Sequence, residues 1–134
     1  KMSKSYNNTI PLFLAEKPLR KAINKIRTNL LEPGVPKDPN DSSVFQIWAA
    51  FASVEETARM RREFQAGIAW GEAKKQLFEL INSELSGPRD NYMRLMDEPG
   101  HIESILLQGA ERAKEHSGKM MCKVREAIGI GAIC

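Results

Sequence analysis

The sequence predicts an all-α fold, an irregular bundle of five or six helices. Through most of the 134 residues, apolar side chains recur at intervals of three and four, the spacing that places them on one face of a helix. No stretch of useful length alternates apolar and polar residues as a half-buried strand does. At 42% hydrophobic and 28% charged residues, the composition suits a single globular domain with a buried core.

A first helix is predicted from Lys17 to about Thr28. Pro18 falls in its first turn, where the fixed φ and the missing N–H of proline are tolerated. The apolar residues that follow at helical spacing are Leu19, Ala22, Ile23, Ile26 and Leu30. The preceding apolar segment, residues 10–14, is too short to stand alone and must pack against another part of the protein.

Residues 31–43 form the longest predicted loop, because three prolines and an Asn-Asp pair interrupt helices and strands there. A loop of this length is either functional or a plain surface connector, and the sequence leaves both open. A short buried helix is predicted next at 44–51. Ser42 or Ser43 caps it, and Trp48 belongs to its core face.

A helix from Val54 to Gln65 has the clearest boundaries. Ser53 and Glu56 form a capping box, in which the serine serves a first-turn amide and the glutamate reaches back. Gly67 is a natural terminator. The arginines of this helix are expected to be solvated or paired with neighbouring glutamates, with RNA contact as the alternative. They are Arg59, Arg61 and Arg62.

Two long helices complete the bundle and are expected to pack as an antiparallel pair. The first begins at Glu72, and Pro88 should kink or briefly break it. The second carries apolar residues on one side from Ile102 to Ile128, and Gly118 weakens it without ending it.

Basic residues concentrate near the N-terminus. Residues 1–40 hold eight Lys or Arg against three Asp or Glu, whereas the whole chain carries a net charge of only +3. Such a surface suits either a solvated helix or contact with the phosphates of ATP or RNA. No apolar run reaches the roughly 18 to 20 residues of a membrane span. The two cysteines and two histidines lack the spacing of a metal site.

Residues 1–5, Lys-Met-Ser-Lys-Ser, carry the most specific chemistry in the chain. Two ammonium groups and two hydroxyls in one polar loop can stabilise the charge that builds on a leaving phosphate. These residues are identical to the signature loop of class I aminoacyl-tRNA synthetases. The chain also resembles bacterial tryptophanyl-tRNA synthetases as far as about Ile130, above all over residues 7–10, 21–26, 67–74, 77–80 and 106–113.

The resemblance implies two parts. Residues 1–15 would be the signature loop and a connector from the catalytic domain, and residues 16–134 the helical C-terminal domain that holds the anticodon end of the tRNA. It also implies a fragment, because the family's Rossmann catalytic domain with its His-x-Gly-His motif is absent from these 134 residues. The intact cytoplasmic enzyme would activate tryptophan with ATP and transfer it to tRNA(Trp). This portion alone is expected to be inactive.

For the intact enzyme, the resemblance implies ATP as a substrate together with Mg²⁺, with no metal ligand from this portion. Lys1 and Lys4 are the expected catalytic residues, which neutralise phosphate charge. Ser3 and Ser5 would donate hydrogen bonds and Met2 would anchor the loop, so all five bind ATP. The other expected partners are tryptophan, tRNA and a second subunit held through the catalytic domain, but neither DNA nor a membrane. Candidate tRNA contacts are Arg20, Lys21, Lys25, Arg27, Lys37 and Asp38.

The residues that read the anticodon do not carry over from the family. Its eukaryotic branch uses an Arg-Asp pair in the loop after the first helix, where this sequence has Asn29-Leu30-Leu31. If the first helix and its loop do not bind RNA, the alternative surface is Arg59, Arg62 and Lys74.

Two other functions remain open at this point. One is another class I synthetase, above all the tyrosine enzyme, whose signature usually has Phe-Gly in place of Met-Ser and whose chain carries a further RNA-binding module. The other is a non-enzymatic helical module that binds RNA or protein, in which Lys-Met-Ser-Lys-Ser is accidental. Sequence upstream of Lys1 would separate these, since only a synthetase has a nucleotide-binding domain there.

Overall fold

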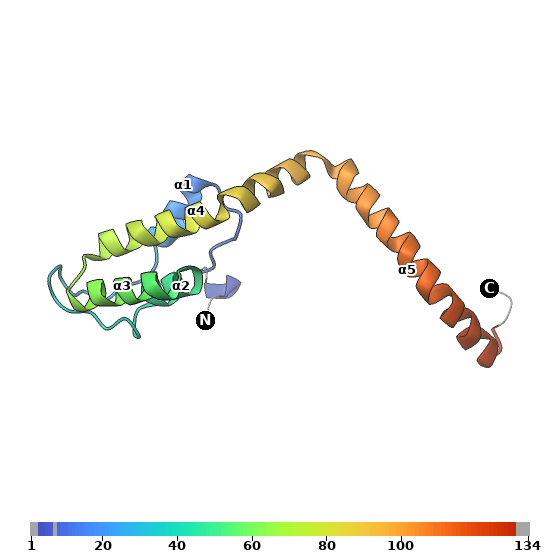
Figure 1. The fold of residues 1–134 in the computed structure, drawn as a ribbon, viewed down its shortest axis with the longest axis horizontal. Coiled ribbons are helices and arrows are strands. Elements are labelled where there is room, and N and C mark those ends of the chain that lie inside the picture. Colours follow the sequence, from blue (N-terminus) through green and yellow to red (C-terminus); the bar gives the residue numbers. More distant parts are fainter. Residues whose placement is uncertain (1–2, 7, 131–134) are drawn as a thin grey trace. The chain divides into compact units, whose positions relative to one another are not determined.

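The computed structural model describes residues 3–6 and 8–130. All of the regular structure within these residues is helical, which confirms the all-α prediction for them (Figure 1). A 3₁₀ turn, η1, comes first, and five α-helices follow: η1 Lys4–Tyr6, α1 Glu16–Asn24, α2 Ser43–Phe51, α3 Val54–Gln65, α4 Trp70–Asp97 and α5 Pro99–Ala127. The chain divides into two compact units, residues 1–91 and 92–134.

One hydrophobic core holds the first unit together, and α1 to α4 all contribute to it (Figure 1). Phe64 of α3 is fully buried. Its ring meets Phe45 of α2 and Trp70 of α4 edge to face, with centroids 5.4 and 5.7 Å apart, a geometry that aromatic pairs prefer. The remaining core residues are Leu19, Ile23, Val44, Trp48, Met60, Ala73, Leu77, Phe78 and Ile81.

Helix α1 ends at Asn24, four residues before the predicted end at about Thr28. The reason is a tertiary contact with α4. The ammonium group of Lys74 donates to the backbone oxygens of Asn24 and Ile26, at 3.0 and 2.7 Å. It satisfies carbonyl groups that the end of a helix leaves without partners. Leu30, predicted to lie on the apolar face of this helix, is 99% exposed.

The caps of α2 and α3 are among those predicted from the sequence. Ser42 is the residue that caps α2, because its hydroxyl accepts a hydrogen bond from the Phe45 amide at 3.3 Å. At α3, Ser53 and Glu56 form both hydrogen bonds of the predicted capping box. Gly67 lies just beyond α3 with φ +91°, a conformation that favours glycine.

The loop between α1 and α2 is held firmly against the α3–α4 corner. The Gly34 amide donates to the Gly67 carbonyl at 2.8 Å, and the Lys37 amide donates to the Phe64 carbonyl at 2.9 Å. Nearer α1, the indole N–H of Trp70 donates to the side-chain oxygen of Asn29 at 3.1 Å. The loop is therefore an ordered part of this unit, whether it is functional or a plain surface connector.

Helix α4 starts two residues before the predicted Glu72 and runs through Pro88 without a break. Pro88 removes one backbone hydrogen bond from the helix interior. The surrounding turn retains other links: the Ser86 hydroxyl donates to the Ser83 carbonyl at 2.9 Å, and Arg89 donates to the Asn82 side-chain oxygen at 2.9 Å. The helix therefore does not break at Pro88, and the predicted kink stays a prediction.

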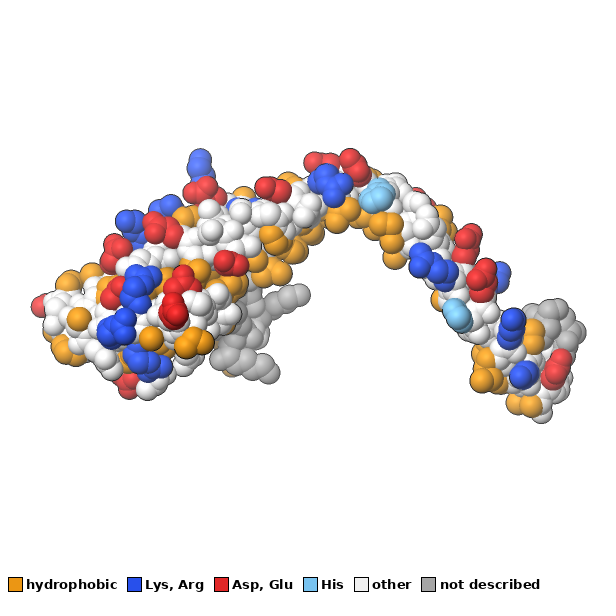
Figure 2. Space-filling model, in the orientation of Figure 1, with side chains coloured by type: hydrophobic (Ala, Val, Ile, Leu, Met, Phe, Trp, Pro, Cys, Tyr) orange, Lys and Arg blue, Asp and Glu red, His pale blue; other side chains and the backbone are white. Residues whose placement is uncertain are grey.

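The second unit contains the end of α4 and all of α5, which passes through Gly118 as predicted. No residue described in α5 is buried, and apolar side chains show along its surface (Figure 2). Their exposure ranges up to 67%, at Leu106. The predicted antiparallel pairing of the last two helices stays a prediction. Within the described part of the chain, no helix has the length and apolar character needed to span a membrane.

A candidate phosphate-binding turn and a basic cavity

The residues of the signature loop that the structure describes fold into a tight turn. The Tyr6 amide donates to the Ser3 carbonyl at 3.2 Å, and the Ser3 amide donates to the Asn8 side-chain oxygen at 2.7 Å. We call residues 3–6 together with Asn8 the N-terminal turn. It places the hydroxyl oxygens of Ser3 and Ser5 2.7 Å apart, in hydrogen-bonding contact.

This arrangement presents two hydroxyl groups at one exposed point. Hydroxyls can donate to the oxygens of an anion, and donors that converge are stronger than isolated ones. Lys1 and Met2 lie outside the described residues, and only the backbone of Lys4 is described, within η1. The roles assigned to these three side chains therefore stay predictions.

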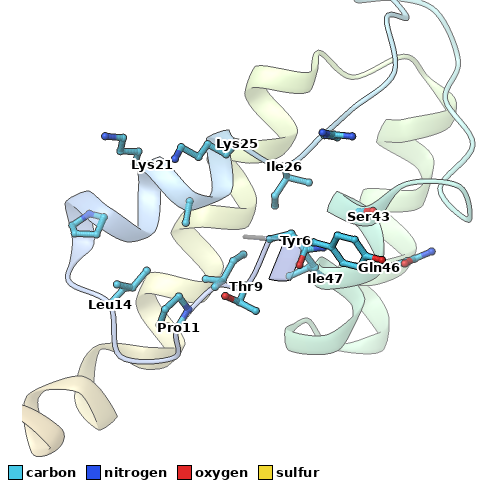
Figure 3. Close-up of a pocket in the computed structure, with 15 residues that line it drawn as sticks. Tyr6, Thr9, Pro11, Leu14, Lys21, Lys25, Ile26, Ser43, Gln46 and Ile47 are labelled. Carbon is cyan, nitrogen blue, oxygen red and sulfur yellow. The ribbon is translucent and has the colours of Figure 1, made fainter. Parts of the chain in front are cut away.

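A cavity of about 1060 Å³ opens between the N-terminal turn, α1, α2 and the connector, which is residues 9–15 (Figure 3). Its apolar wall comes mainly from the connector and from the inner sides of the two helices. Its polar groups come from Tyr6, Asn8, Thr9, Ser43 and Gln46. The described residues that line it are Tyr6, Asn8, Thr9, Ile10, Pro11, Leu14, Pro18, Lys21, Ala22, Lys25, Ile26, Arg27, Ser43, Gln46 and Ile47. We call this the basic cavity.

Among the residues that the structure describes, three cations line the basic cavity and no carboxylate does. Lys21 and Lys25 lie one turn apart on α1, so they share a face of the helix; Figure 3 shows both side chains extending from α1. Arg27 follows from the segment after the helix. None of the three forms an ion pair with any residue between 3 and 130 that the structure describes. The cavity therefore has a net positive lining.

Arg20, also on α1, does not line the basic cavity. Its guanidinium lies 4.1 Å from the centre of the Phe78 ring of α4. It also forms a weak ion pair with Glu16, at 3.9 Å. Contacts of this kind fix the side chain against the neighbouring helix. Arg20 is exposed but is directed towards α4, away from the group formed by Lys21, Lys25 and Arg27.

Lys37, one of the predicted tRNA contacts, is buried in the structure. Its side chain is only 2% exposed. The ammonium group donates to the backbone oxygens of Glu32 and Val35, each at 2.9 Å, and lies 5.6 Å from the Trp70 ring centre. A buried ammonium group needs such partners. Lys37 therefore holds the loop together and has no surface to offer RNA.

Asp38, next to Lys37, is exposed, but its carboxylate also serves the backbone. One oxygen accepts a hydrogen bond from the Asn40 amide at 2.8 Å, which is the local turn that aspartate favours. Its other oxygen is an acceptor on the loop surface. The structure thus separates Lys37 and Asp38, which are adjacent in the sequence, into a buried and an exposed position.

The alternative RNA surface is not assembled as one group. Arg59 pairs with Glu63 at 3.0 Å, as predicted for its helical spacing. Lys74 is committed to the end of α1, and burial lowers the pKa of its ammonium group below the ordinary value. Arg62 remains exposed on α3. Two of these three cations therefore already have partners within the fold.

Sequence reasoning missed the polar wall of the basic cavity. The sequence patterns assign no role to Tyr6 or Gln46, and they predict Ser43 only as one of two possible caps of the helix at 44–51. About forty residues separate the N-terminal turn from α2, and no local pattern connects them. No group of three or more His, Cys, Asp or Glu among the described residues could hold a metal ion.

No family model matches the sequence. Several curated proteins, however, are similar to it. The tryptophan–tRNA ligase of Neisseria meningitidis is 48% identical over 97% of this chain, and that of Pseudomonas aeruginosa is 46% identical over 99% of it. The chain matches the C-terminal part of tryptophanyl-tRNA synthetases. It spans only 39% and 30% of the length of those two relatives.

Solved structures of tryptophanyl-tRNA synthetases have the same fold. The crystal structure of the Campylobacter jejuni enzyme complexed with ADP and tryptophan matches 96% of this chain with a TM-score of 0.90 at 35% identity. The match covers 41% of the crystallised chain. The predicted resemblance to tryptophanyl-tRNA synthetases is confirmed by these relatives, and the helices of this chain correspond to the C-terminal helical domain of that family.

Proposed function

We propose that this chain acts as the C-terminal portion of a tryptophan–tRNA ligase. In that enzyme it supplies the loop that neutralises the phosphates of ATP and a helical domain that binds tRNA(Trp). The observation that carries the proposal is the match to curated tryptophan–tRNA ligases over nearly the whole of a chain that begins with Lys-Met-Ser-Lys-Ser. A tyrosine enzyme and an unrelated helical module are less well supported, because the curated relatives named here are tryptophan enzymes.

In the first step, the carboxylate of tryptophan attacks the α-phosphorus of ATP and pyrophosphate leaves. Negative charge grows on the leaving group, and positioned cations and donors lower the barrier. Lys1 and Lys4 supply the cations in this proposal, and Met2 anchors the loop. The Ser3 and Ser5 hydroxyl oxygens lie 2.7 Å apart, so one of the two donates to the other. Both serines can donate to the same phosphate once this mutual hydrogen bond opens. Mg²⁺ would enter with the ATP phosphates.

In the second step, the activated tryptophan passes to the terminal ribose of the tRNA, so the enzyme must hold the tRNA as well. Lys21, Lys25 and Arg27 are the best-supported contacts, because they line one cavity without a carboxylate. Arg20 and Asp38 are exposed and stay in the proposed surface. Lys37 is left out because it is buried.

The finer expectations about the intact protein are also proposals. We infer that it works in the cytoplasm, where tRNA is charged, and that it forms a homodimer through the part of the relatives that this chain does not span. Tryptophan and ATP would bind mainly to that part. The 134 residues alone would then show no activity, because they hold the neutralising loop without a pocket for adenine or tryptophan.

A chimaera tests the catalytic part of the proposal. This chain would replace the matching C-terminal 39% of the Neisseria meningitidis relative, and tryptophan-dependent ATP–pyrophosphate exchange would be measured. We expect Lys4→Ala to slow adenylate formation by about 10² to 10³, the size expected on removing one transition-state donor. Lys17→Ala, at an exposed lysine on α1, is the matched control and should leave the rate unchanged.

Two results would contradict the catalytic role. One is a Lys4→Ala chimaera with an unaltered chemical step and only a weaker complex with tryptophan. The other is tryptophan-dependent exchange catalysed by the 134-residue chain by itself. A chimaera that binds tRNA equally well after Lys21→Ala and Lys25→Ala would remove α1 from the RNA surface, while leaving the role of Lys4 in place.

A further inference from the structure

We propose that the basic cavity receives one unpaired nucleotide of the bound RNA. Its phosphate would lie at Lys21, Lys25 and Arg27, and its base would lie against Tyr6. This inference rests on the proposed function and deepens it, because it says which part of the RNA enters the protein and by what chemistry. Three properties of the cavity support this proposal: its size, its charge and its polar wall.

The size of the cavity suits a nucleotide. Sites for small molecules usually enclose about 300 to 1000 Å³, and the basic cavity encloses about 1060 Å³. The lining also has the mixed character of such sites, with apolar side chains from the connector and the helices and a few polar groups between them. A base, a sugar and a phosphate present the same mixture of flat apolar faces and polar edges.

The charge of the lining selects an anion. Lys21, Lys25 and Arg27 contribute three positive charges, no Asp or Glu lines the cavity, and no described acid forms an ion pair with them. Cationic ligands and acceptor-poor apolar ligands would leave these groups without partners. A phosphate group is a partner that any of these side chains can bind, as Arg and Lys side chains do along RNA backbones.

Tyr6 provides the surface for a base. The side chain is 78% exposed although its ring lines the cavity, and Figure 3 shows it directed towards the α2 side, near Ser43 and Gln46. An exposed aromatic ring beside cations is the combination on which proteins stack unpaired bases. Every base has a flat face, so this contact tolerates any sequence.

Gln46 can bind the edge of the base. Its side-chain nitrogen donates to the Asn40 carbonyl at 3.1 Å, which fixes the amide group. Within the described residues this leaves the amide oxygen as an acceptor on the cavity wall. An exocyclic amino group of adenine, cytosine or guanine is a matching donor, and so is the ring N–H of guanine or uracil. Gln46 can therefore bind the edge of a base without selecting among the four.

Paired RNA cannot make these contacts. In a duplex the bases are stacked on one another and only the backbone and the groove edges are accessible. Duplex RNA would meet the three cations but would leave Tyr6 and Gln46 without partners. A preference for single strands is therefore the property that separates a nucleotide pocket from a merely basic surface.

The test uses the 134-residue chain and a labelled six-nucleotide single-stranded RNA of mixed sequence, with the same strand in a duplex as the comparison. The dissociation constants are measured by fluorescence anisotropy at several salt concentrations. We expect tighter binding of the single strand, and about a tenfold loss on Tyr6→Leu, which removes the stacking contact. Duplex binding should not change in this variant. Because Tyr6 is exposed, its replacement leaves the core intact.

The other variants separate charge from base contact. Lys25→Ala should weaken both RNAs and flatten the salt dependence by about 0.7 for the single strand. Gln46→Leu should weaken binding of the single strand but not of the duplex, whose base edges are already paired. Lys75→Ala, an exposed lysine on α4 that does not line the cavity, is the matched control and should have no effect beyond the loss of overall charge.

Distinct results overturn distinct claims. Equal affinity for single strand and duplex, with no effect of Tyr6→Leu, would overturn the nucleotide pocket while Lys25→Ala could still support the proposed tRNA surface. If neither the single strand nor the duplex bound, both the nucleotide pocket and the proposed tRNA surface would be overturned. Displacement of the single strand by ATP, with an equal loss of ATP affinity on Tyr6→Leu, would show a site for free nucleotides and overturn its assignment to RNA.

Discussion

At the scale of single residues, lysines of similar sequence context have opposite uses in this protein. Lys37 and Lys74 donate to backbone oxygens inside the fold, whereas Lys21 and Lys25 face the basic cavity without an ion-pair partner among the described residues. A lysine that satisfies carbonyl groups stabilises the fold, and one without a partner is available to a ligand. The structure makes this distinction through burial and contact.

The carboxylate of Glu56 gives a prediction at this scale. Hydrogen bonds from the Ser53 side chain and amide lower its pKa below the ordinary value of 4.5. A lowered pKa means that the ionised carboxylate stabilises the fold above about pH 4.5, and that this stabilisation is lost as the pH falls through the folded-state pKa. Ser53→Ala should therefore raise the pKa of Glu56 towards 4.5 and lower the melting temperature more at pH 7 than at pH 3.

Titration of the Glu56 side chain by NMR and melting curves at both pH values check this expectation. Ser43→Ala is the control, because Ser43 is the first residue of α2 and Ser42 forms the cap. A loss of stability that is the same at both pH values would show that the capping box acts without its charge.

At the scale of elements, the approach of two backbones fixes the position of the long loop on α3. Gly34 and Gly67 both have positive φ, at +85° and +91°, and the Gly34 amide donates to the Gly67 carbonyl. A Cβ added at Gly67 would lie 2.4 Å from the carbonyl carbon of Gly34, whereas one added at Gly34 would meet nothing within 4 Å. Backbone atoms cannot move aside as a flexible side chain can, so only Gly67 is required by space as well as by conformation.

These two glycines form a matched pair of variants. Gly34→Ala should cost about 1 to 2 kcal/mol of unfolding free energy, the cost of a positive φ in a residue with a Cβ. Gly67→Ala should cost about 1 to 3 kcal/mol more, because overpacking is added to the same strain. Urea denaturation of both variants measures the difference. Equal losses would show that the loop can withdraw from α3 at little cost.

At the scale of the whole chain, every residue of the hydrophobic core lies within residues 1–91. The last of these is Ile81. The second unit has no buried residue in α5, and an isolated helix gains little stability without a packed face. The folding free energy of the described chain therefore resides in its first unit.

Truncation tests this division. A chain that ends at Asn91 should keep its unfolding free energy within about 0.5 kcal/mol of that of the full 134 residues, because it loses no core contact. A chain that ends at Glu79 loses Ile81 and should be less stable by at least about 2 kcal/mol. Denaturant melts of the three chains give both values. A large loss on ending at Asn91 would mean that α5 stabilises the first unit through contacts of its own.

The sequence by itself determined the fold class, the capping of α3, the core position of Trp48 and the resemblance to tryptophanyl-tRNA synthetases. Each of these depends on neighbours within a few residues: apolar spacing along a helix, a serine three residues before a glutamate, or five residues of a signature loop. Patterns of this kind can be recognised in the sequence alone because the interactions that cause them join residues close together in the chain.

Only the tertiary structure decided the early end of α1, the burial of Lys37 and the existence of the basic cavity. Lys74 reaches carbonyl groups about fifty residues earlier in the chain, and Trp70 lies near the ammonium group of Lys37 across more than thirty residues. The cavity joins the N-terminal turn to α2 across about forty residues. Contacts between segments so distant depend on how helices pack, and the residues concerned carry no local signal of their future partners.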